Sequence, residues 1–296
     1  LCGSVPVPPL PPVGQYSGFY NFPTRFINES VVPQDQILKV TDAIYLSLRD
    51  MHNNIAPYDF MAIEYNPSSY GETTPRGIKL GDSAFPDLNA GNPRWEVIAH
   101  ENGHNFFGGT SAFYGKLAFG HPFLQESLAV LSAFYTYHAL YDNLNRFGIN
   151  QNTVASLDYD FKNGRVYQET QYNRYVSQGK PFNIDDVLTS QALDYQMILY
   201  GEKYGWSNYK KFTKAFENGI ATQFTFQNDG VSAIEQSTYV IAALGAAFNQ
   251  DFRPTFTLLG FPIDDSLYIE ISQEIQKYIV APGTNLPPTI SGVSGP

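Results

Sequence analysis

Three residues suited to metal binding and acid–base chemistry lie within one short, apolar segment. His100 and His104 are four residues apart, and Glu101 directly follows the first of them. On an α-helix, residues four apart share a face, so both imidazoles can point at one cation. The flanking residues are mostly apolar, and burying these groups without partners would be costly. The pattern therefore favours a zinc site over an inert exposed helix face, with Glu101 placed to take a proton from water.

A catalytic zinc ion needs a third protein ligand, and Glu126 is the strongest candidate for it. Residues 123–135 are apolar nearly all round, which predicts a buried helix with Pro122 in its first turn. Glu126 is the one acidic residue of that run, and a lone carboxylate on a buried helix is expected to be neutralised or ligated. His121 is the alternative: it either ligates the metal or binds substrate in the cleft.

The His-Glu-x-x-His motif at residues 100–104 is followed by Glu126 in the sequence Gln-Glu-Ser-Leu-Ala. This combination resembles the gluzincin zinc metallopeptidases, the clan of thermolysin and aminopeptidase N. Within the clan, the run His-Glu-Asn-Gly-His-Asn is most similar to the enhancin-like, mucin-degrading peptidases. Residues 199–212 and 244–263 resemble the helical C-terminal lobe of those enzymes. The resemblance implies a thermolysin-like core, Zn²⁺ as cofactor and Glu101 as the catalytic base.

The resemblance also implies where substrate would bind. In gluzincins a strand just before the zinc helix forms the upper edge of the cleft and pairs with the substrate backbone. Residues 77–82 are the candidate for this edge, with Gly77, Ile78 and Lys79 as substrate-binding residues; an ordinary central strand is the alternative. Tyr195 is a candidate for the oxyanion-stabilising tyrosine. The Gly-x-Met-Glu-Asn motif, by which aminopeptidases hold a free amino group, is absent from the sequence, which favours an endopeptidase.

We therefore expect a secreted zinc-dependent endopeptidase that acts on proteins or glycoproteins through a zinc-activated water. Two alternatives stay open: an aminopeptidase-type exopeptidase of the same clan, and a non-catalytic surface adhesin with a structural zinc site. The glycoprotein substrate follows from the resemblance alone. The intact Glu101 argues against the adhesin, because a purely structural zinc site needs no base.

Size and charge limit the class of protein. The chain has 296 residues, 43% of them hydrophobic, enough for one large domain or two lobes around a cleft. Its net charge of −10 argues against nucleic acid or an anionic membrane surface as a partner. The single cysteine, Cys2, excludes an internal disulfide framework; we expect a free thiol there, with a lipid-anchor site as the alternative. No run is long and apolar enough for a transmembrane segment.

The elements that position these residues are expected to form an α+β fold with two lobes. Residues 1–18 are expected to be a Pro-rich linker, residues 19–147 a mixed α/β N-terminal lobe that carries the zinc-binding helices, and residues 148–281 a mainly helical C-terminal lobe. Residues 282–296 resemble a linker into a missing β-sandwich module. We therefore expect further modules of a longer chain, and an extracellular or cell-surface location.

Hydrophobic periodicity predicts most of the individual elements. Besides the two helices of the metal segment, it predicts strands within 19–32, 60–65 and 77–82, and helices at about 33–53, 184–204, 208–218, 233–247 and 266–279. Residues 70–75 are expected to form a loop. Residues 141–178 alternate polar and aromatic residues without a clean period, so no element is predicted there.

Overall fold

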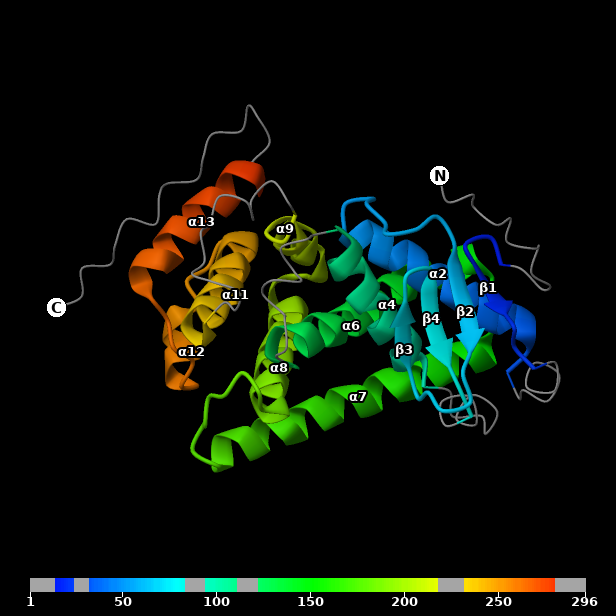
Figure 1. Ribbon diagram of the computed structural model, residues 1–296, viewed down its shortest axis with the longest axis horizontal. Helices are drawn as coiled ribbons and strands as arrows, with labels where there is room; N and C mark the ends of the chain where they lie inside the picture. The colour runs from blue at the N-terminus through cyan, green and yellow to red at the C-terminus, as the bar shows by residue number, and fades with distance from the viewer. Residues whose placement is uncertain (1–13, 24–31, 83–93, 111–121, 218–231, 280–296) are drawn as a thin grey trace, which may run out of the picture.

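The computed structural model describes residues 14–23, 32–82, 94–110, 122–217 and 232–279. These residues form an α+β fold, with a mixed four-stranded sheet and its helices first and a mainly helical part after them (Figure 1). The predicted α+β class with a mainly helical C-terminal part is therefore confirmed, and the thermolysin-like core stays a prediction. Cys2, His121 and the expected linker at 282–296 lie outside the described residues. Among the described helices, none has the length and apolar character needed to cross a bilayer.

The sheet has the strand order β1-β2-β4-β3. It consists of β1 (Ser17–Tyr20), β2 (Met61–Tyr65), β4 (Gly77–Leu80) and β3 (Glu72–Thr74). The first three strands run parallel, and β3 pairs antiparallel with β4. Phe19, Ile63 and Ile78 lie in register across the parallel strands and are buried. One face of the sheet therefore packs against the hydrophobic core.

One expectation for this sheet is wrong, and of the two alternatives for residues 77–82 the structure shows the central strand. Residues 70–75 contain the strand β3, whose polar sequence Glu-Thr-Thr shows no apolar alternation that would predict a strand. Residues 77–82, the expected edge, contain β4, which lies between β2 and β3. Gly77, Ile78 and Lys79 each pair with a residue on both sides, so their backbone groups are already used within the sheet. Strand order depends on contacts between separate segments, which a local pattern does not encode.

The two helices of the metal segment pack directly against each other. α4 (Trp95–Thr110) lies between the sheet and α6 (Pro122–Phe147), and α2 (Gln34–Met51) contacts both helices (Figure 1). Gly103 makes the close approach possible, because a Cβ on it would lie 2.6 Å from the Cβ of Ser132 on α6. The glycine inside the His-Glu-x-x-His motif therefore sets the spacing between the helices that carry the candidate ligands.

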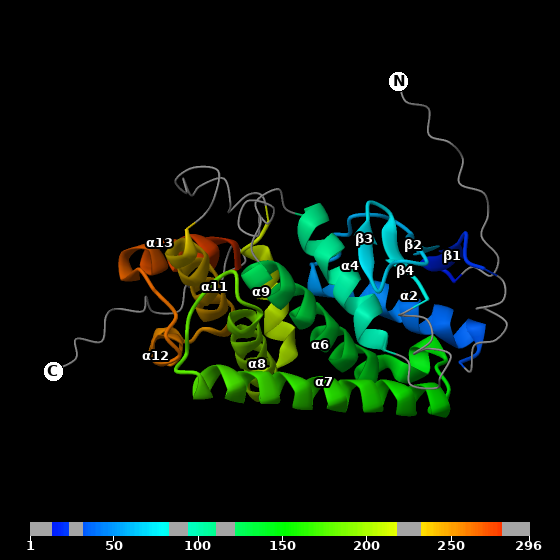
Figure 2. The same ribbon diagram turned by 60° about the horizontal axis from the view of Figure 1, so that its bottom comes forward.

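The helix α7 (Gln151–Ser177) is the largest element that the sequence did not predict. It runs along one side of the molecule beneath α6 and α8 (Figure 2) and contacts α4 as well. Asn150 caps its N-terminus by accepting a hydrogen bond from the Thr153 backbone N–H at 2.8 Å. Its buried positions are mostly polar or aromatic, namely Thr153, Leu157, Asp160, Gln168 and Tyr175. Such a face gives no clear hydrophobic period, which explains why the helix was missed.

The remaining helices follow the predicted pattern closely. α8 (Val187–Tyr204), α9 (Tyr209–Lys214), α11 (Ala233–Phe248) and α13 (Asp265–Ile279) correspond to the four predicted helices, and η1 (Trp206–Asn208) and α12 (Arg253–Leu258) are additional short turns. α11 begins with a capping box formed by Ser232 and Glu235.

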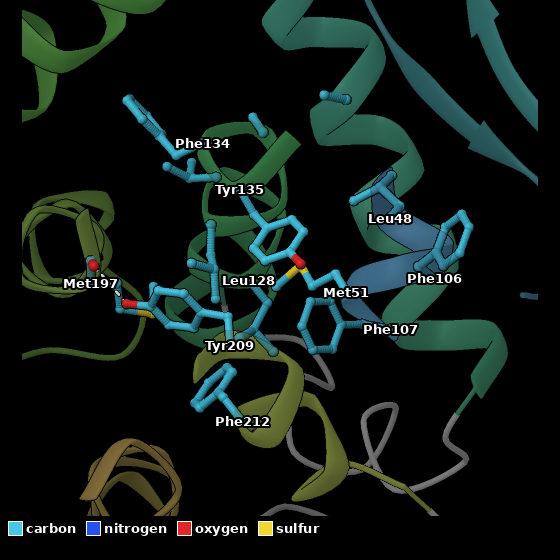
Figure 3. Packing of buried hydrophobic residues seen from close by; sticks show 14 of the residues in the cluster. Leu48, Met51, Phe106, Phe107, Leu128, Phe134, Tyr135, Met197, Tyr209 and Phe212 are labelled. Atoms are coloured by element: carbon cyan, nitrogen blue, oxygen red, sulfur yellow. Dashed lines mark hydrogen bonds between the residues drawn. The ribbon is translucent and has the colours of Figure 1, made fainter. Parts of the chain in front are cut away.

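The core joins the sheet-bearing part to the helical part. Figure 3 shows side chains from five helices meeting at its centre: Leu48 and Met51 of α2, Phe106 and Phe107 of α4, Leu128, Phe134 and Tyr135 of α6, Met197 of α8, and Tyr209 and Phe212 of α9. Phe106 and Phe107 are fully buried. Truncating such a side chain to alanine costs about 3–5 kcal/mol of unfolding free energy. These two residues therefore hold α4 against the hydrophobic core.

Candidate metal centre

The structure brings His100, His104 and Glu126 together at the contact between α4 and α6. The Nε2 atoms of the two histidines lie 3.2 Å apart. Nε2 of His100 lies 3.2 Å from Oε2 of Glu126, and Nε2 of His104 lies 3.9 Å from Oε1. One ligand atom from each residue can be chosen so that all three lie within 4.8 Å of one another. Ligand atoms on a tetrahedral zinc ion with bonds of 2.0–2.2 Å lie about 3.3–3.6 Å apart, so the three residues fit a metal ion.

The centre faces solvent on one side. The side chains of His100 and His104 are 17% and 12% exposed, and that of Glu126 is 41% exposed. A structural zinc site is closed by four protein ligands, whereas a catalytic site keeps a position open for water or substrate. Among the described residues, three protein ligands with a partly exposed carboxylate match the open type.

Neighbouring protein groups favour the protonation states that metal binding requires in Glu126 and His104, and favour a proton on His100. The hydrogen bond from His100 lowers the pKa of Glu126, so this carboxylate is ionised at neutral pH. Burial and the charge of His100 lower the pKa of His104 to about 4, so its imidazole is neutral. Burial also acts to lower the pKa of His100, but the hydrogen bond and charge of Glu126 outweigh it and raise that pKa. A cation bound between these groups would take the place of the proton on His100.

Two asparagines of the motif fasten α4 to its surroundings. Asn105 donates from Nδ2 to the backbone oxygen of Gly77 on β4 at 2.5 Å. Tyr58 donates its hydroxyl hydrogen to Oδ1 of Asn102 at 2.5 Å, and Asn102 donates to the backbone oxygen of Ile98 at 2.7 Å. These bonds fix the rotation of α4 about its axis and hence the direction of the ligand face. Sequence analysis assigned neither asparagine a role, although both stand within the His-Glu-Asn-Gly-His-Asn run.

Glu101 is partly buried and lies beside the start of β3. Burial raises its pKa, and the charges of Glu126 and Glu72 act in the same direction, while the charge of His100 opposes them. A raised carboxyl pKa brings the group closer to neutral pH, where a general base accepts and returns a proton most effectively. The environment of Glu101, which directly follows the ligand His100, therefore suits proton transfer.

The other residues singled out by sequence are not brought to the metal by any described contact. Gly77, Ile78 and Lys79 lie on the interior strand β4, and the side chain of Ile78 is fully buried. The ring of Tyr195 stacks on Tyr172 of α7 at 4.8 Å, with the guanidinium of Arg165 at 4.6 Å. The described contacts of Tyr195 thus join α8 to α7, and an oxyanion role for it stays a prediction.

Asp194 of α8 is a buried carboxyl group near the metal centre that sequence analysis passed over. It is 2% exposed, and its Oδ1 has no hydrogen-bond partner among the described residues. Burial raises its pKa to about 8, while a hydrogen bond from Ser127 and the charge of His100 act against the rise. The signal in the sequence was an acidic residue among the mostly apolar residues 192–198. This residue directly precedes Tyr195, the candidate that the resemblance favoured.

Comparisons of this chain with protein-family models, with curated proteins and with solved structures found no match. The interpretation of the centre therefore depends on its own residues: a His-His-Glu group that could hold a metal ion, spaced as in the gluzincin motif.

Proposed function

We propose that this protein is a zinc-dependent endopeptidase of the gluzincin type. The single observation that carries the proposal is the convergence of His100, His104 and Glu126 at metal-ligand distances, with Glu101 next to the first ligand. A binding-only zinc site would need the ligands but not the adjacent, partly buried carboxylate. The solvent-facing side of the centre leaves room for water and a peptide carbonyl.

The chemistry divides between the metal and Glu101. When bound by His100, His104 and Glu126, Zn²⁺ supplies a Lewis acid that lowers the pKa of water and polarises a peptide carbonyl. Glu101 accepts the proton of the attacking water at its carboxylate and delivers it to the leaving amine. Its raised pKa supports both halves of this transfer. Glu126 adds a negative charge to the ligand set, which reduces the net positive charge at the centre.

The strand β3 replaces β4 as the candidate for substrate alignment. β3 pairs only with β4 among the described strands, and Glu72 and Thr73 are exposed. It contacts α4, and a Cβ added to Gly71, just before it, would lie 2.8 Å from Oε1 of Glu101. An extended peptide that adds to this edge would pass beside the base, a common mode of peptide recognition. We propose proteins, including glycoproteins, as substrates and an extracellular or cell-surface location, both on the strength of the motif resemblance.

Zinc stoichiometry and cleavage of short peptides test the proposal. We expect about one zinc ion per wild-type chain and a clear loss of zinc affinity in Glu126→Ala, because the variant removes one of three ligands. Peptides with a blocked amino terminus should be cut as well as free ones, since an endopeptidase does not need the free amine. Cleavage restricted to free amino termini would favour the exopeptidase. Unchanged zinc affinity in Glu126→Ala would contradict the proposed ligand set.

A further inference from the structure

The N-terminus of α4 is held by side chains of α7. Arg94 directly precedes the helix, and its guanidinium has no acceptor atom for the free backbone N–H groups of the first turn. Instead, the backbone N–H of Glu96 donates to Oδ2 of Asp160 at 2.9 Å. The indole N–H of Trp95 donates to Oγ of Ser156 at 3.0 Å. Asp160 thus performs the role of an N-cap carboxylate from a different helix.

The same oxygen of Asp160 also binds α6. The hydroxyl of Tyr137 donates to Oδ2 of Asp160, and both residues are buried, with exposures of 3% and 9%. One carboxylate oxygen of α7 therefore accepts hydrogen bonds from both helices that carry the candidate ligands. On α4 the contact lies one turn before His100, because Glu96 is four residues ahead of it.

We infer that Asp160 is a positioning residue of the metal centre, which holds the first turn of α4 against α6 so that His100 and Glu126 face one ion. The inference depends on the proposed function, because it assumes that the centre binds zinc. Without the cap, the first turn of α4 frays or shifts in part of the population. Apparent zinc affinity then falls in proportion to the fraction of molecules with a competent site.

The burial of Asp160 supports a specific role for the carboxylate. Burial raises its pKa to about 6, against the opposing effect of the bonds from Tyr137 and Glu96. A buried carboxylate is costly unless it accepts hydrogen bonds. The donors to Asp160 belong to α4 and α6, the two helices that carry the candidate ligands. A carboxylate that served only to stabilise the fold would leave zinc affinity unchanged, which makes the two roles separable by experiment.

The test compares zinc affinity in three α7 variants by competition with a chromogenic chelator. Asp160→Ala removes the acceptor and should weaken zinc binding about 3- to 30-fold, as expected for loss of a helix cap. Asp160→Asn keeps an acceptor of the same shape and should stay within about 2-fold of the wild type. Asp158→Ala is the matched control: Asp158 also accepts a hydroxyl hydrogen bond from α6, from Tyr141, but makes no hydrogen bond to the described residues of α4. It should bind zinc as the wild type does.

A spectroscopic readout accompanies the affinities. With Co²⁺ in place of Zn²⁺, the visible absorption reports ligand geometry, and only Asp160→Ala should alter it. Equal zinc affinity and equal spectra of Asp160→Ala and the wild type would overturn this inference alone. Absence of zinc binding by the wild type would overturn the proposed function and this inference with it. If Asp160→Ala does not fold, Tyr137→Phe takes its place in the test. Zinc binding that is weaker by about 2- to 10-fold in Tyr137→Phe would support the inference. Wild-type zinc affinity in this variant would overturn it.

Discussion

A side chain at Gly71 would collide with the carboxylate of Glu101. A Cβ added to Gly71 would lie 2.8 Å from Oε1 of Glu101 and 2.9 Å from Cγ1 of Val97. Both distances are shorter than a normal contact, so a methyl group at this position must displace a neighbour. The end of the glutamate side chain moves most easily because it is flexible. The absence of a side chain at Gly71 therefore sets where the proposed base can stand.

Gly71→Ala should reduce catalysis without loss of zinc. We expect kcat to fall by about 10- to 100-fold, because a displacement of about 1 Å in a reacting group is enough for such a loss. None of the three atoms nearest to the added Cβ belongs to His100, His104 or Glu126, so zinc affinity should stay at the wild-type value. Peptide-cleavage kinetics together with zinc titration measure both quantities. Full activity of this variant would show that Glu101 is not held by this contact.

Gly103→Ala should disturb the metal centre through packing. Its methyl group would lie 2.6 Å from Cβ of Ser132 and 3.1 Å from Cα of Ala129 on α6, so the two ligand helices must separate. Overpacking of this kind typically costs about 1–3 kcal/mol of unfolding free energy, and zinc affinity should fall with it.

Gly164→Ala is the matched control for that variant. Gly164 also lies within a helix, α7, but a Cβ there would only touch Phe134 at an ordinary 3.5 Å. Because alanine favours helix more than glycine by about 1 kcal/mol, urea denaturation should show equal or greater stability. If both alanine variants kept wild-type stability and zinc affinity, the close helix packing at Gly103 would be contradicted.

His52 should make the protein sensitive to acid. The side chain is 3% exposed and packs against the rings of Phe106 and Phe107 on α4, with ring centroids 5.4 Å and 4.6 Å away. Burial lowers its pKa from 6.5 to about 3. The unfolded chain binds a proton at this histidine below pH 6.5 while the native protein does not, so the native state loses stability as pH falls from 6.5 toward 3.

Denaturation of the metal-free protein at several pH values measures this effect. Relative to His52→Leu, the wild type should lose about 1.4 kcal/mol of unfolding free energy per pH unit below pH 6.5. The variant should show a shallower dependence, because it has one fewer group to protonate on unfolding. Parallel pH profiles for the two proteins would contradict the burial of a neutral His52.

The metal centre was predictable because its signal is local. His100 and His104 are placed together by the helical repeat, and Glu126 is conspicuous as the one acid of the apolar run 123–135. The interactions that position these residues connect distant parts of the chain. Asp160 meets Glu96 across 64 residues of sequence, and no local pattern indicates this contact.

The sheet and α7 illustrate the same limit in the fold. β4 was recognised as a strand from its composition, but its interior place depends on pairing with β2 and β3. α7 buries polar groups such as Asp160, whose hydrogen bonds to Glu96 and Tyr137 are known only from the tertiary structure. A hydrophobic period cannot reveal a helix whose buried face is polar.

The most direct test of the central claim is a map of cleavage products from wild type and Glu101→Gln, run side by side. Mass spectrometry of a mixture of unmodified proteins and an O-glycosylated mucin would identify every cut site, and zinc content would be measured on the same samples. We expect internal cuts by the wild type, and a loss of about 10²- to 10⁴-fold in Glu101→Gln with zinc retained, because the base is removed and the ligands remain. Equal cleavage by both proteins, or none by a zinc-loaded wild type, would contradict the assignment of a zinc endopeptidase.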